Sequence, residues 1–109
     1  MARQTVMMAY ITVPNRDEAL KLATVLVEER LAACANIHDG MTSLYWWQGK
    51  MEQAEEVSLI VKTRADLIED LKRRVCQLHS YAVPCIVAWP ITDGHETFLD
   101  WVRDETRKV

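Results

Sequence analysis

The hydrophobic and polar positions of the chain follow two patterns, one typical of strands and one typical of helices. Short apolar runs over residues 5–13, 56–63 and 85–89 predict buried or half-buried strands. A further strand region is expected from about residue 35 to 48. Gly49-Lys50 separates this region from the strand that follows it, which predicts a β-hairpin.

Two longer segments and the C-terminal tail carry the helical pattern. In residues 16–32 and 64–80, apolar side chains recur at spacings of three and four, as on an amphipathic helix. Asn15 precedes the first segment as a candidate N-cap, and Glu18 stands where a capping box places its acidic residue. The apolar stripe of this helix is expected to comprise Leu20, Leu22, Ala23, Leu26, Val27 and Leu31. The side chains of the tail helix expected to point inward are Phe98, Trp101 and Val102.

The order of these elements predicts an α+β fold of the ferredoxin-like type. It reads β-α-β-β-α-β followed by a C-terminal helix, and no linker or repeat divides residues 1–109, so a single domain is expected. In that arrangement two helices cover one face of a four-stranded antiparallel sheet. No further element is left to cover the other face.

The expected hairpin carries three consecutive aromatic residues, Tyr45, Trp46 and Trp47. Successive side chains of a strand point to opposite faces, so Tyr45 and Trp47 share one face and Trp46 takes the other. Large aromatic side chains left in water favour aggregation, and they are common anchors of protein interfaces. We therefore expect self-association through this hairpin, the alternative being a hairpin folded back on its own sheet.

Composition limits the kinds of partner that the chain is expected to bind and the cell compartment in which it is expected to lie. The net charge is −3 and the isoelectric point is near 5.6, so the basic surface of a general nucleic-acid binder is not expected. The apolar run near the start is too short to cross a membrane, and a signal-peptide pattern is missing there. Cys34, Cys76 and Cys85 form no disulfide pattern, which favours reduced thiols in the cytoplasm.

Several of these segments resemble the CutA family of divalent-cation tolerance proteins. They include LVEERLAACANI, SLYWWQGK, EEVSLIVKT, HSYAVPCIVAWPITDG and FLDWV, and they span nearly the whole chain. The resemblance implies a ferredoxin-like protomer in a tight homotrimer, whose hairpins pair across subunits, and a similarity of shape to PII-type signalling proteins. It also implies a role in metal-ion tolerance.

A metal site is the first candidate for chemistry. Cys76 and His79 lie three residues apart on one helix, and Cys85 follows at the start of the next strand. Thiolate and imidazole suit copper and zinc, but buried cysteine is also a common small hydrophobe. Many family members carry Glu at the position of Cys85 and some a thiol at that of Ile11. Cys85 therefore either replaces a ligand or marks the loss of the site.

A cleft for a small ligand is the second candidate. By resemblance it would lie between subunits, with Glu56, Lys62 and Tyr81 near it, together with Trp47. A structural ion pair is the plainer interpretation of the two charged residues. The functions weighed are thus a non-enzymatic metal-tolerance protein with copper or another divalent metal, a PII-like small-molecule sensor, and a Cys/His enzyme built on Cys85 and His79. The first is the leading hypothesis, and no catalytic residue is assigned.

Overall fold

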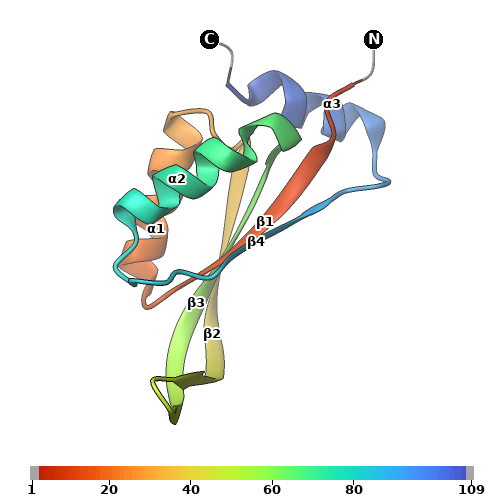
Figure 1. The fold of residues 1–109 in the computed structure, drawn as a ribbon. Helices are drawn as coiled ribbons and strands as arrows, with labels where there is room; N and C mark the ends of the chain where they lie inside the picture. Colours follow the sequence, from red (N-terminus) through yellow and green to blue (C-terminus); the bar gives the residue numbers. More distant parts are fainter. Residues whose placement is uncertain (1–2, 108–109) are drawn as a thin grey trace.

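Residues 3–107 of the 109-residue chain are described by a computed structural model (Figure 1). Its elements are β1 (Val6–Val13), α1 (Arg16–Glu28), β2 (Cys34–Trp47), β3 (Lys50–Arg64), a 3₁₀ turn (Ala65–Leu67), α2 (Ile68–Leu78), β4 (Ile86–Pro90) and α3 (Glu96–Glu105). None of the helices within residues 3–107 is long and apolar enough to cross a membrane.

The four strands form one antiparallel sheet in the order β2-β3-β1-β4. The helices α1 and α2 lie side by side over one face of it, and α3 lies at the end near the chain termini (Figure 1). This is the ferredoxin-like α+β fold that the element order predicts, with the extra C-terminal helix.

The core lies between this face of the sheet and the helices. In β3 the residues Val57, Leu59 and Val61 are buried on the helix side, as the alternation predicts. They pack with three groups of apolar residues, which are Ala9, Ile11 and Val13 of β1, Ala19, Leu22, Ala23 and Leu26 of α1, and Leu71 and Val75 of α2. One compact core therefore holds the sheet and both long helices together.

Two predicted stripes are confirmed in part. Of the stripe at α1, Leu22, Ala23, Leu26 and Leu31 are buried as expected, but Leu20 and Val27 are exposed, and Ala19 joins the buried face. In α3 the side chains of Phe98 and Trp101 are exposed, so the prediction that they point inward is wrong. Leu99 and Val102 are buried there instead and pack with Val6 of β1. Phe98 and Trp101 contact each other instead, with ring centroids 5.6 Å apart.

The β2–β3 hairpin projects well beyond the rest of the domain (Figure 1). The protein measures 50 × 25 × 22 Å along its principal axes, and the hairpin accounts for the long axis. Gln48 and Gly49 have φ values of 50° and 81°, which gives the two-residue turn that the twist of a hairpin favours. The turn lies one residue before the predicted Gly49-Lys50, because Lys50 already begins β3. A register shift between His38 and Met41 bends β2 where the sequence Asp39-Gly40 suggests an interruption.

Candidate functional site

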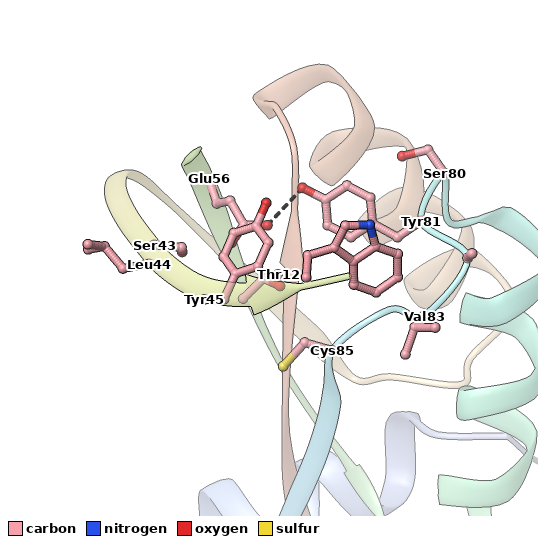
Figure 2. A pocket seen from close by; sticks show the side chains of 11 residues that line it. Thr12, Ser43, Leu44, Tyr45, Glu56, Ser80, Tyr81, Val83 and Cys85 are labelled. Carbon is pink, nitrogen blue, oxygen red and sulfur yellow. Dashed lines mark hydrogen bonds between the residues drawn. The ribbon is translucent and has the colours of Figure 1, made fainter. Parts of the chain in front are cut away.

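A cavity of about 550 Å³ lies at the hairpin end of the sheet, on the face that the helices do not cover. Its walls come from β1, β2, β3 and the segment between α2 and β4 (Figure 2). The lining residues are Thr12, Ser43, Leu44, Tyr45, Trp47, Glu56, Ser80, Tyr81, Ala82, Val83 and Cys85. A volume of this size is typical of small-molecule sites.

Strand alternation explains which side chains reach this cavity. In β2 the residues Ser43, Tyr45 and Trp47 point to one face, and Trp46 points to the other. Trp46 does not line the cavity and is 74% exposed. Glu56 of β3 pairs with Met41 of β2, so it shares the face of Tyr45 and Trp47.

A hydrogen bond between two buried or half-buried groups closes one side of the cavity. The hydroxyl of Tyr81 donates to Oε2 of Glu56 at 2.8 Å (Figure 2). Glu56 is only 7% exposed. Burial, and then the hydrogen bond to Glu56, raise the pKa of Tyr81 well above its ordinary value of 10.0. The phenol therefore stays protonated at neutral pH and continues to donate to the carboxylate.

The segment that carries Tyr81 is fastened by His79, whose ring is buried. The backbone N–H of Tyr81 donates to Nδ1 of His79 at 3.0 Å, so the proton of the neutral ring is on Nε2. Nε2 then donates to the carbonyl of Thr12 at 2.7 Å. The rings of His79 and Tyr81 also contact each other, with centroids 4.9 Å apart.

Glu18 forms hydrogen bonds with Ser80, which lies between His79 and Tyr81 in the same segment. Its Oε2 accepts hydrogen bonds from the backbone N–H and the hydroxyl of Ser80, at 3.1 and 3.0 Å. Only half of the predicted capping box is therefore used for the helix. The side chain of Asn15 caps α1 by accepting from the N–H of Glu18 at 2.8 Å, while the carboxylate of Glu18 turns to Ser80. The N-terminus of α1 thereby positions one wall of the cavity.

The structure does not bring Cys76, His79 and Cys85 together as a metal site. Among residues 3–107, no group of three His, Cys, Asp or Glu side chains is placed to hold a metal ion. Both ring nitrogens of His79 are engaged by the backbone, and Cys76 is exposed on α2. The residues present therefore do not fit the metal centre that these three were expected to form. Cys85 lies instead on the cavity wall, exposed.

Two of the three residues predicted for the ligand cleft are found together, and the third is not. Glu56 and Tyr81 line the cavity with Trp47. Lys62 lies six residues further along β3, roughly 20 Å away along the strand, and donates to Oδ1 of Asn36 at 3.1 Å. The roles of Thr12 and Ser80 were missed, because they depend on chain segments that meet only in the folded protein.

The fold and the site define a small α+β domain with one open sheet face and a cavity of ligand size at the end of that face. Comparison with known sequences gives the family. A family model described as "CutA1 divalent ion tolerance protein" matches residues 7–105. The chain belongs to this family, as the sequence motifs predicted.

Individual relatives agree with this assignment. The chain is 51% identical over 96 residues to the "Divalent-cation tolerance protein CutA" of Thermus thermophilus, which covers 88% of this chain and 93% of that protein. It is 47% identical to "Protein CutA, chloroplastic" of Arabidopsis thaliana, over 90% of this chain but only 54% of the plant protein. The solved CutA1 structure from Oryza sativa superposes with a TM-score of 0.94 at 40% identity, covering 97% of each chain.

Proposed function

We propose that this chain acts in divalent-cation tolerance as a non-enzymatic homotrimer of the cytoplasm. The main observation that supports this proposal is the open face of the sheet. It presents exposed apolar side chains from β4, Val87 and Trp89, and the apolar hairpin extends from one end of it. Among the described residues no helix or loop covers the middle of this face (Figure 1). Contiguous exposed apolar surface of this kind marks an association site.

The hairpin also exposes apolar side chains, and it does so on both of its sides. Tyr45 and Trp47 are exposed on the cavity side, and Trp46 and Met51 are exposed on the outer side. A hairpin that is apolar on both faces gains stability in water from a partner that packs on either of them. Copies of the same chain supply such cover in closed symmetric assemblies.

Sedimentation velocity at micromolar concentration tests the trimer. We expect a single species of three times the 12.6 kDa chain mass. A species of single-chain mass at both low and high concentration would contradict the proposal.

The cytoplasm is favoured by the thiols. Cys34, Cys76 and Cys85 are all free in the described chain, and cysteines persist as thiols in reducing compartments. Relatives occupy several compartments, since plant members are named chloroplastic and one archaeal structure is named periplasmic. Fractionation of the native cells, with the chain detected by antibody, tests this part of the proposal.

The tolerance role is proposed without a resident metal centre, because the described side chains do not assemble one. The family assignment supports the role, and growth tests it. A strain lacking the gene should lose tolerance to at least one cation of a copper, zinc, cobalt and cadmium series, and the wild-type gene should restore it. Unchanged growth across the series would contradict the role.

Copper is the first metal to titrate against the purified protein, since thiolate is a soft ligand. Binding that falls in Cys85→Ala and not in Cys76→Ala would assign a weak contact to the cavity wall. Equal binding by wild type and by the Cys76, His79 and Cys85 variants would remove these three residues as ligands.

A second candidate function is a small-molecule sensor, and the cavity favours it. Polar groups of Glu56 and Tyr81 lie in a space bounded by aromatic residues, which is the composition of ligand sites. A thermal-shift screen of metabolites tests it. The absence of any shift at millimolar ligand would count against this function.

A further inference from the structure

The cavity has a negative charge and no positive one among its lining residues. Among the lining residues of the described chain Glu56 is the only carboxylate, and no Lys, Arg or His is present. The carboxylate of Glu18, which fastens Ser80, lies close enough to the phenol of Tyr81 to help to raise its pKa. An anion entering this space meets repulsion, and a cation meets attraction.

The carboxylate of Glu56 still has room for a donor. Its Oε2 accepts from Tyr81, and no described residue donates to its Oε1. Glu56 as a whole residue is 7% exposed, and it lines the cavity. A positively charged ligand that donates a hydrogen bond provides a partner for this free oxygen and an opposite charge for the carboxylate.

The walls around this carboxylate suit an organic cation. Tyr45, Trp47 and Tyr81 line the cavity. Figure 2 shows the rings of Tyr45 and Tyr81 beside it. Aromatic faces attract ammonium groups and cover the carbon atoms attached to them. Two more charges lie near the rim, Glu52 opposite Tyr45 and Lys50 opposite Trp47 in the hairpin register, and they offset each other.

A bare metal ion fits less well than an organic cation. The lining offers one carboxylate and one thiol, and residues 3–107 contain no three-ligand cluster. A divalent ion of the hard kind takes six or more oxygen ligands, and zinc takes four ligands. The volume of about 550 Å³ is also far larger than a single ion requires.

We infer that this cavity binds a small organic ammonium ion, with its N–H groups on the Glu56 carboxylate and its carbon atoms against Tyr45 and Trp47. The inference rests on the proposed sensor function and names the ligand class for it. The hydroxyl of Tyr81 orients the carboxylate toward this ligand.

Cys85 allows the charge preference to be measured directly. Its thiol is exposed on the wall of the same cavity, and Cys76 is an exposed thiol outside it. In thiol–disulfide exchange the Cys85 thiolate attacks one sulfur of a symmetric disulfide. The S–S bond of the probe breaks, half of the probe stays as a mixed disulfide, and the other half leaves as a thiolate.

The probes are three disulfides of similar size: cystamine, which is cationic, bis(2-hydroxyethyl) disulfide, which is neutral, and 3,3′-dithiodipropionate, which is anionic. Reduced full-length protein is exposed briefly to each probe at neutral pH. Labelling at each cysteine is then read by peptide mass spectrometry. The ratio of Cys85 to Cys76 labelling cancels the intrinsic reactivity of each probe.

We expect this ratio to be about fivefold higher for cystamine than for the neutral probe, as one partly screened charge provides. The anionic probe should give the lowest ratio. Glu56→Gln keeps an acceptor for Tyr81 and removes the charge, so it should abolish the preference. The matched control is Glu55→Gln, since Glu55 is the neighbouring residue, faces the other side of the hairpin and bonds to Thr42 at 2.9 Å. It should leave the preference unchanged.

Three results would overturn the inference. One is the same Cys85 to Cys76 ratio for all three probes. The second is a cystamine preference that survives in Glu56→Gln. The third is a Cys85 that none of the probes labels while Cys76 reacts, because the cavity is then closed in the assembled protein. Sedimentation is read separately, so a lost ligand site and a lost trimer are distinguishable.

Discussion

The two faces of the sheet are built from the same strands, but helices cover one face and leave the other open. On β3 the side chains of Val57, Leu59 and Val61 lie under α1 and α2, and they are fully or nearly fully buried. The alternate residues, from Glu56 to Lys62, face the side without helices. One face is closed within the chain, and the other ends in an aromatic hairpin and a cavity. A domain of this size has enough helix for one face only.

This difference between the two faces indicates that stability and binding depend on different parts of the protein. The helix-covered face holds the fold, because its contacts lie within one chain and are mostly apolar. The other face mixes apolar and polar groups, which is typical of a surface that meets partners or ligands.

Deleting a large side chain from the closed face should cost the most. Leu59 is 0% exposed, so Leu59→Ala should lower the free energy of unfolding by about 2–5 kcal/mol through lost burial and the cavity left behind. Guanidinium unfolding followed by circular dichroism measures this loss. Leu20→Ala removes the same atoms at an exposed site of α1 and should cost about 0.5 kcal/mol or less. Equal losses would show that the described core is misplaced.

Removing the outer tryptophan should weaken association and leave the protomer folded. Burying a large aromatic side chain contributes roughly 1.5–3 kcal/mol, so Trp46→Ala should raise the dissociation constant about tenfold to a hundredfold. Trp47→Ala should act in the same direction. Sedimentation across a dilution series measures the change, with Leu20→Ala as the control. An assembly unchanged at low micromolar concentration would contradict this role of the hairpin.

Removing the buried imidazole should destabilise the protein by about 1–3 kcal/mol. His79→Ala leaves the carbonyl of Thr12 and the N–H of Tyr81 without their partners. The wall of the cavity should loosen as well, which amide hydrogen exchange of residues 80–85 reports. A stability equal to that of wild type would show that His79 does not fasten this segment.

The smallest effect concerns the alkaline stability. The folded protein holds the Tyr81 proton more tightly than the unfolded chain does, because its pKa is raised above 10.0. This contribution is fully present below about pH 10 and is lost as the pH rises through the folded-state pKa. Tyr81→Phe should cost about 1 kcal/mol at neutral pH and should flatten the loss above about pH 10. Urea unfolding from about pH 8 to 11 compares the two slopes, and parallel curves would contradict the assignment.

Much of the fold could be predicted from the sequence because its signals are local. Asn15 as an N-cap, the alternation in β3 and the turn at Gly49 depend on neighbouring residues only, and the structure confirms them. Phe98 and Trp101 show the limit of this reasoning. Helical spacing says which residues share a face, but the shape of the facing surface decides which face turns inward.

The candidate site could be predicted only in part, for a related reason. Glu56 and Tyr81 were named together from a family resemblance, and they do meet. Cys76, His79 and Cys85 were grouped by their spacing along the chain, but spacing does not say that the backbone of Thr12 and Tyr81 claims both nitrogens of His79.

The sequence by itself determined the order of elements, the face of each strand that is apolar, the family and the aromatic hairpin. These are properties of periodicity and composition, which no tertiary contact alters. Only the tertiary structure decided that segment 79–85 crosses the end of the open face and turns a flat surface into a cavity. That outcome depends on hydrogen bonds between residues more than sixty positions apart, such as Glu18 with Ser80. Such pairs leave no mark in a local pattern, because their geometry exists only once the chain has folded.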